Sequence, residues 1–380
     1  MQLICTSDFD IINKIGIVVF TISIKLGKDT AFNMKLTFRW YGENDPVTLE
    51  KIRQIPTMDG IVTAVYDVPV GEVWSKESIQ ALKSKINAAG MAFEVVESVP
   101  VHEDIKLGNP NAAKWMASYC ENIRRLGEAG VKVICYNFMP VFDWLRSELR
   151  RAHKDGSNSL AYDNSAVLSM NPLTSELSLP GWDESYTKEE LKDLLNRYKG
   201  IDEEQLWRNL QAFLQAIIPV AEECNIKMAI HPDDPPWGLF GLPRIITDEV
   251  NIERFLKLVD SPANGLSFCT GSLGASDKND LPKMARRFGN RIYFAHLRNI
   301  RWTGERSFEE VGHPTSCGSL DMYEIVKGLV ESGFDGYVRP DHGRMIWGET
   351  GRFGYGLYDR ALGATYLAGL FEAVERSSAK

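Results

Sequence analysis

The stretch Met228-Ala229-Ile230-His231-Pro232-Asp233 is a short apolar run that ends in a side chain able to bind a metal. The same pattern recurs further along the chain, in Leu266-Ser267-Phe268-Cys269-Thr270-Gly271, Ile292-Tyr293-Phe294-Ala295-His296-Leu297 and Tyr337-Val338-Arg339-Pro340-Asp341-His342-Gly343. Such runs are typical of buried parallel strands, because helices cover both faces of a parallel sheet. Parallel α/β folds place their chemistry at the carboxyl ends of these strands. We therefore expect the four strand ends to meet at one rim.

The sequence around these stretches alternates between strand and helix patterns. The expected strands cover residues 36–41, 60–66, 92–96, 131–138, 226–231, 265–269, 291–296 and 336–340. The expected helices cover residues 46–55, 75–89, 111–129, 202–225, 251–259, 281–288, 320–331 and 358–374. Gly90 and Gly130 follow two of these helices as glycines that end them. Eight strands, each followed by a helix, predict an α/β fold of the (β/α)8 TIM-barrel type.

Two segments depart from this alternation. Residues 146–200 are long, polar and rich in Asp, Ser and Asn, so we expect an insertion after the fourth strand. A loop of this length is usually functional, such as a lid, or disordered. The clear strand signals begin after Met34, so residues 1–33 are expected to be an N-terminal extension outside the native fold. Residues 34–380 would then form a single catalytic barrel domain.

Composition narrows the class of protein. The chain has 380 residues, of which 44% are hydrophobic, enough for a large core. A net charge of -8 argues against nucleic acid as a partner, because nucleic-acid binding requires basic patches. No stretch reaches the length of a transmembrane helix, so we expect no membrane partner. The six cysteines form no CxxC pair and indicate free thiols in a reducing compartment, which fits a cytoplasmic enzyme.

The four strand ends carry His231, Cys269, His296 and Asp341. Each residue alone is more often structural than functional, but all four fall at the same point of successive strand–helix units. Imidazole, thiolate and carboxylate together suit a first-row divalent ion such as Mn, Fe, Co or Zn. We therefore predict one shared metal, with an open coordination position for a substrate.

Arginines also lie at or just beyond the expected strand ends. Their planar guanidinium groups bind carboxylates in a bidentate manner, so they predict an anionic substrate. Aromatic and amide side chains at the same level would complete the walls of the site. The candidate substrate-binding residues are Arg39, Trp40, Asn137, Arg298, Arg339 and Arg344.

At these residues the sequence resembles the mannonate dehydratases of hexuronate catabolism. The stretches that carry the resemblance run over residues 37–42, 136–144, 230–236, 268–272, 296–299 and 338–344. The resemblance implies a xylose-isomerase-like TIM barrel that uses Mn2+ or Fe2+. It also implies a hydro-lyase that converts D-mannonate to 2-dehydro-3-deoxy-D-gluconate in glucuronate catabolism. We further expect a homo-oligomer, namely a dimer.

Such a dehydration needs a base for the weakly acidic C2 proton and an acid for the departing C3 hydroxyl. The candidates are His342, Tyr355 and Asp341, although Asp341 is better suited to the metal. The sequence leaves open which residue is the base and which is the acid. Two alternatives also stay open, a metal-dependent sugar isomerase or epimerase on the same barrel and a non-catalytic sugar-acid-binding protein. Isomerase sites often use two or more carboxylate ligands, and only Asp341 is an obvious one here.

Overall fold

The computed structural model describes residues 34–172 and 187–378. The expected extension, residues 1–33, lies outside the described residues. Eight parallel strands close into a barrel in the order β1-β12-β9-β8-β7-β4-β3-β2. They are β1 (Lys35–Arg39), β2 (Gly60–Thr63), β3 (Ala92–Glu97), β4 (Val133–Tyr136), β7 (Lys227–Ile230), β8 (Asn264–Cys269), β9 (Ile292–Leu297) and β12 (Tyr337–Pro340). The predicted (β/α)8 barrel is confirmed.

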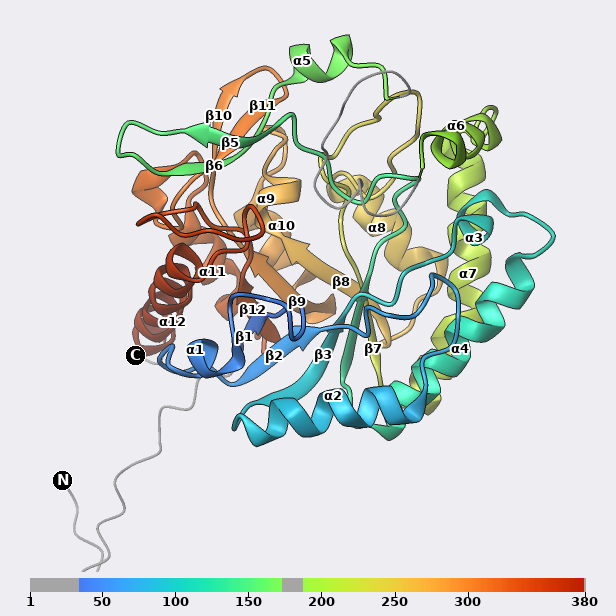
Figure 1. Cartoon of the computed structure of the whole chain (residues 1–380), viewed down its shortest axis with the longest axis horizontal. Helices are drawn as coiled ribbons and strands as arrows, with labels where there is room; N and C mark the ends of the chain where they lie inside the picture. The colour runs from blue at the N-terminus through green and yellow to red at the C-terminus, as the bar shows by residue number, and fades with distance from the viewer. Residues whose placement is uncertain (1–33, 173–186, 379–380) are drawn as a thin grey trace, which may run out of the picture. The chain divides into compact units, whose positions relative to one another are not determined.

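Helices surround the barrel, with α4 and α7 on one side and α11 and α12 on the other (Figure 1). The described helices are α1 (Leu49–Arg53), α2 (Lys76–Ala88), α3 (Glu103–Leu107), α4 (Ala112–Glu128), α5 (Asn164–Ser169), α6 (Lys188–Arg197), α7 (Glu203–Glu223), α8 (Glu249–Leu258), α9 (Thr270–Leu273), α10 (Leu281–Phe288), α11 (Met322–Glu331) and α12 (Tyr358–Ser378), with two short 3-10 turns at Gly289–Arg291 and Thr315–Cys317. Among them, no helix is long and apolar enough to cross a membrane.

Local sequence signals explain where several helices begin and end. The side chains of Asp202, Asp248 and Asp280 each accept a hydrogen bond from a backbone N–H in the first turn of α7, α8 and α10. Such a cap stabilises a helix by about 1 kcal/mol because it satisfies an otherwise unpaired donor. Gly90 and Gly130 follow α2 and α4 with φ angles of 78° and 86°, as expected for glycines that end helices.

The barrel interior is filled by side chains that alternate inward along the strands. A small apolar cluster occupies it, made of Val62, Val95, Val133, Cys135, Ala229, Phe294 and Tyr337. A much larger cluster packs between the strands and the surrounding helices. The described barrel interior is therefore a packed core, which leaves room for a ligand at the mouth where the strands end.

Most of the described part of the insertion between β4 and β7 is regular secondary structure, so the expectation of a long loop over residues 146–200 is wrong for that part. The hairpin of β5 (Glu148–Ala152) and β6 (Asn158–Tyr162) turns at Asp155-Gly156, a pair that favours tight turns. It pairs with a second hairpin, β10 (Ile300–Gly304) and β11 (Ser307–Glu310), in the sheet order β10-β11-β6-β5. Figure 1 shows this small sheet beyond the barrel strands. Residues 173–186 lie outside the described part.

Candidate active site

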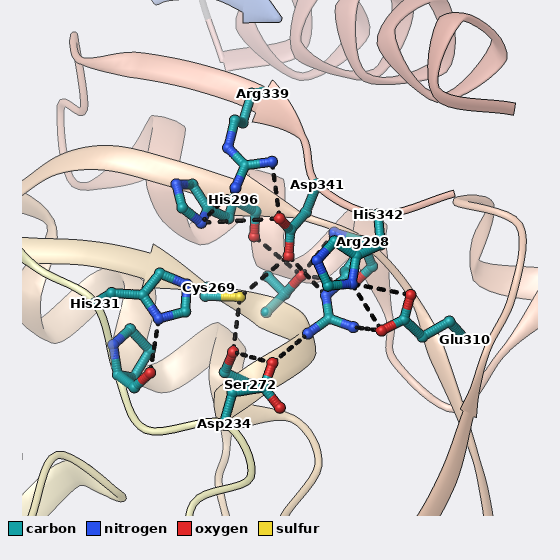
Figure 2. Close-up of polar contacts among 12 residues, drawn as sticks. His231, Asp234, Cys269, Ser272, His296, Arg298, Glu310, Arg339, Asp341 and His342 are labelled. Atoms are coloured by element: carbon teal, nitrogen blue, oxygen red, sulfur yellow. Dashed lines mark hydrogen bonds and ion pairs between the residues drawn. The ribbon is translucent and has the colours of Figure 1, made fainter. Parts of the chain in front are cut away.

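The structure brings the four predicted metal ligands together. Parallel register pairs Cys269 of β8 with His296 of β9, and His296 with Arg339 of β12. Ligand atoms of His231, Cys269 and His296 all lie within 4.8 Å of one another. The Sγ of Cys269 is 3.4 Å from Oδ2 of Asp341, and Nδ1 of His296 is 3.9 Å from Oδ1 of Asp341 (Figure 2). This spacing is close to what one divalent ion with N, S and O ligands spans.

His231 is oriented by its own backbone neighbour. Its Nδ1 lies 2.7 Å from the carbonyl oxygen of Pro232, which can only accept a hydrogen bond. Nδ1 therefore carries the proton, and Nε2 keeps the lone pair that a metal would use. Backbone carbonyls commonly fix metal-binding histidines in this way. The donor set thus fits a divalent ion in its chemistry as well as its spacing.

Asp341 lies between two arginines. Nη1 of Arg339 is 2.8 Å from Oδ1, and Nε of Arg298 donates to Oδ2 at 2.7 Å. Burial alone would raise the pKa of Asp341, but Arg339, His342 and Arg298 hold it well below its usual range. The carboxylate is therefore ionised at neutral pH, as a metal ligand must be.

A second carboxylate, which the sequence reasoning did not select, lies in the same cluster. Glu97 ends β3, and its Oε2 is 3.4 Å from Nε2 of His296. Glu97 also accepts two hydrogen bonds from Arg339, at 3.0 and 3.1 Å. With Cys135 and His296 it forms another group whose ligand atoms lie within 4.8 Å of one another. Its place at a strand end was the available signal, so counting carboxylates in the sequence underestimated the acidity of the rim.

His342 and Tyr355 form a hydrogen-bonded pair. The hydroxyl of Tyr355 lies 2.9 Å from Nε2 of His342, and Nδ1 of His342 lies 2.8 Å from Oε1 of Glu310. Burial raises the pKa of Tyr355 well above its usual value, so its hydroxyl is protonated at neutral pH. Glu310, on β11 of the small sheet, was not selected from the sequence because that hairpin was not predicted.

A network of buried charged side chains lies next to Asp341 and the pair of His342 and Tyr355. Arg146 donates to both oxygens of Asp234, at 2.8 and 3.0 Å, and to Glu310 at 2.9 Å. Arg298 donates to Asp234 at 2.9 Å and also to Glu310. Each of these side chains is at most 3% exposed. Buried charges are stable only when paired in this manner, so the network holds the loops after β4, β7 and β9 in fixed positions.

A cavity of about 190 Å3 opens in front of these residues. This volume is below the roughly 300 Å3 of pockets for drug-sized ligands, and so suits a small metabolite. The predicted residues that line it are Arg39, Asn137, His231, Arg339, Asp341, His342 and Tyr355. Cys269 and His296 are fully buried behind the lining.

Three residues expected to bind substrate do not line the cavity. Trp40 is 4% exposed and belongs to the core between strands and helices. Arg298 lies behind Asp341, with its guanidinium engaged by carboxylates. Arg344 points toward the insertion and pairs with Asp155 and Asp359. The sequence predicted that these residues lie at or just beyond strand ends, but it did not predict the directions of their side chains.

A larger cavity of about 790 Å3 lies beside α5 and α6. It is lined by residues such as Tyr162, Trp237 and Phe240, and none of its described lining residues is His, Cys, Asp or Glu. The chemistry of the described residues therefore identifies the smaller cavity at the barrel mouth as the candidate active site.

Comparisons with known proteins identify the family of the chain. Residues 34–380 match the family described as D-mannonate dehydratase (UxuA). A mannonate dehydratase of Streptococcus agalactiae serotype III is 58% identical over 347 residues, which cover 91% of this chain and all of the relative. Mannonate dehydratase 2 of Halalkalibacterium halodurans is 58% identical over 90% of this chain and 99% of its own length. The crystal structure of mannonate dehydratase from Streptococcus suis serotype 2 superposes with a TM-score of 0.85 at 50% identity, covering 91% of this chain and 96% of that one.

Proposed function

The chain belongs to the D-mannonate dehydratase family, and from this membership we propose that it is a hydro-lyase that removes water from D-mannonate to give 2-dehydro-3-deoxy-D-gluconate. One observation carries the proposal. The pair of His342 and Tyr355, joined at 2.9 Å, lines the same small cavity as the metal-capable His231 and Asp341. The residues proposed for proton transfer and those proposed to hold the metal can therefore reach the same substrate molecule at the same time.

The reaction is difficult because the proton at C2 lies next to a carboxylate and is weakly acidic. A Mn2+ or Fe2+ ion held by His231, Cys269, His296 and Asp341 would act there as a Lewis acid on the substrate carboxylate. The two histidines, the thiolate and the ionised Asp341 supply the ligand types that such ions accept. Asp341 is thus proposed as a metal ligand and not as a proton carrier, because Arg339 and Arg298 help to hold its pKa so low that it is a weak base and has no proton to give at neutral pH.

Arg39 and Asn137 are the proposed substrate-binding residues, together with Arg339. The Nε of Arg39 is buried and has no hydrogen-bond partner among the described residues, which suits a donor reserved for a ligand. The Oδ1 of Asn137 accepts from the backbone N–H of Met139 at 3.2 Å, which leaves its amide donors to face the cavity. Substrate oxygens would satisfy these donors.

His342 and Tyr355 are the proposed proton carriers. Together they provide a base for the C2 proton and an acid for the C3 hydroxyl. Neither is a proposed metal ligand, so metal binding and proton transfer can be tested separately by mutation.

The test is turnover of purified protein on a panel of hexonates, with Mn2+, Fe2+, Co2+ or Zn2+ added aerobically and anaerobically. The proposal predicts a 2-keto-3-deoxy acid from D-mannonate and little product from the other hexonates. An epimer or isomer formed without loss of water would instead support the isomerase alternative. Saturable binding without turnover under every metal would support a sugar-acid-binding protein.

The same proposal includes a homo-oligomer, namely a dimer. It also includes a cytoplasmic location, a role in glucuronate catabolism and the absence of nucleic-acid and membrane partners.

A group of exposed apolar side chains supports association between copies of the chain. Trp347 is 73% exposed, its ring lies 5.6 Å from that of Tyr358, and Leu362 is 50% exposed nearby in sequence on α12. Exposed apolar patches commonly mark interfaces. Light scattering of the wild-type protein and of Trp347→Ala measures the oligomeric state, and a monomer in both would remove this part of the proposal.

A further inference from the structure

Glu310 connects the small sheet to the pair of proposed proton carriers. It is the last residue of β11, outside the barrel, and its side chain is 2% exposed. Its Oε1 and Oε2 lie 2.8 and 3.0 Å from Nδ1 of His342 (Figure 2). The other ring nitrogen of His342, Nε2, lies 2.9 Å from the hydroxyl of Tyr355. Three side chains from two separate elements therefore form one continuous chain of hydrogen bonds, Glu310 to His342 to Tyr355.

The charge of Glu310 determines the direction of these hydrogen bonds. Burial alone would raise its pKa, but Arg298, His342 and Arg146 lower it to about 2. An ionised carboxylate can only accept, so Nδ1 of His342 carries a proton that it donates to Glu310. In neutral imidazole the other nitrogen then has the lone pair. Nε2 therefore accepts the hydrogen bond from the Tyr355 hydroxyl.

We propose that Glu310 is a positioning residue, which holds His342 in the Nδ1–H tautomer so that Nε2 is always ready to accept the proton of Tyr355. This inference rests on the proposed dehydration for its catalytic consequence, but not for the tautomer itself. Buried carboxylates serve histidines in this way where a histidine must act as a base. A hydrogen bond from Nδ1 to an acceptor on a fixed β-strand also prevents rotation of the ring.

The consequence for the reaction is a defined route for two protons. Transfer of the Tyr355 proton to Nε2 gives a phenolate and an imidazolium, whose positive charge Glu310 stabilises. The phenolate takes the proton from C2, and the electron pair of the C2–H bond forms the second bond between C2 and C3. The C3–O bond breaks as the imidazolium returns its Nε2 proton to the leaving hydroxyl. Water and the enol of the product leave, and Tyr355 and His342 regain their starting protonation.

The test is the tautomer of His342, measured from imidazole 15N chemical shifts of histidine-labelled protein. The substrate-free protein is loaded with diamagnetic Zn2+, and the His342 signals are assigned by their loss in His342→Asn. We expect an Nδ1–H tautomer in the wild type and a mixed or reversed tautomer in Glu310→Gln. Turnover of Glu310→Gln should fall by about 100-fold or more, the scale of losing a proton-transfer residue, with a KM within a few-fold of wild type. An unchanged tautomer in Glu310→Gln would overturn the proposal.

Asp234→Asn provides a matched control. Asp234 binds the same two arginines as Glu310, at 2.8 to 3.0 Å, but no described hydrogen bond joins it to His342. If any buried negative charge beside these arginines were enough, both variants would change the tautomer of His342. That result would count against Glu310 as the specific partner. Our account predicts that only Glu310→Gln changes the tautomer.

Tyr355→Phe covers the case in which Glu310→Gln does not fold. With Glu310 intact, His342 should keep its Nδ1 proton even without the tyrosine hydroxyl. A predominantly Nε2–H tautomer in Tyr355→Phe would show that the tyrosine, and not Glu310, sets the proton position. Both readouts use substrate-free protein, so they stand even if wild-type protein fails to dehydrate D-mannonate. That failure would overturn the proposed function alone.

Discussion

The Nε of Arg298 donates a 2.7 Å hydrogen bond to Oδ2 of Asp341, which lines the cavity at the barrel mouth, whereas Arg298 does not. The same guanidinium donates to Asp234 at 2.9 Å and to Glu310. Arg298 thus supports both the proposed metal ligand Asp341 and the positioning residue Glu310. Arg298, which the sequence suggested for substrate binding, is paired with buried carboxylates and does not line the cavity.

Replacing Arg298 by methionine should destabilise the protein strongly. Three buried carboxylates would lose their common cation, and breaking a buried ion pair costs about 3–5 kcal/mol. The same change at Arg344 is the matched control, because its side chain is 23% exposed and only one of its two carboxylate partners, Asp359, is buried, whereas Asp155 is 57% exposed. Denaturant unfolding should show a smaller loss for Arg344→Met than for Arg298→Met, with a KM for D-mannonate near that of wild type. A tenfold rise in KM for Arg344→Met would return that residue to the substrate site.

His342→Asn and Tyr355→Phe should keep their metal but lose turnover. Neither side chain is among the proposed ligands, and removing a general acid or base typically costs on the order of 100- to 10,000-fold in rate. Elemental analysis and kcat on D-mannonate measure the two effects separately. Near-normal kcat in both variants, with metal retained, would shift proton transfer to another group.

The strand ends could be predicted from sequence because each buried strand is a short apolar run. The run of residues 226–231 and the structure's β7 differ by one residue at each end, and His231 follows directly. The hairpin of β10 and β11 could not be predicted in the same way. Four of the five residues of β10 are exposed, so the strand has no apolar pattern to reveal it.

The acidic residues Glu97 and Glu310 were missed, and the one local signal was the place of Glu97 at a strand end. A glutamate at the end of a strand reads as ordinary surface charge, and only the tertiary arrangement buries it against arginine and histidine. The directions in which side chains point could not be predicted from the sequence either. Arg339 and Arg344 lie five residues apart, yet only Arg339 lines the cavity at the barrel mouth.

Acid should weaken the wild-type protein more steeply than Glu310→Gln. The pKa of Glu310 in the folded protein, about 2, is below the ordinary glutamate value of 4.5, so its ionised form stabilises the fold above about pH 4.5. That contribution, on the order of 3 kcal/mol, is lost as pH falls from about 4.5 toward 2. The free energies of unfolding of the two proteins should therefore converge across this window. A difference that stays constant with pH would show that Glu310 does not titrate with folding.

Deleting residues 1–33 should leave turnover intact. The family match begins at residue 34, and the proposed metal ligands and proton carriers all lie beyond it. Comparing kcat and KM of the truncated and full chains on D-mannonate checks this. A truncated protein that folds, as judged by circular dichroism, but has lost turnover would show that the segment contributes to function.

The most direct test of the account is the metal content of purified protein by elemental analysis, alongside Cys269→Ala and His296→Ala. Both residues are fully buried and can affect an ion only from within the cluster. The account predicts one divalent ion per wild-type chain, and an ion that is absent or greatly reduced in both variants, with dehydration of D-mannonate lost in parallel. Full metal occupancy in both variants would contradict it, because the ion would then be held elsewhere.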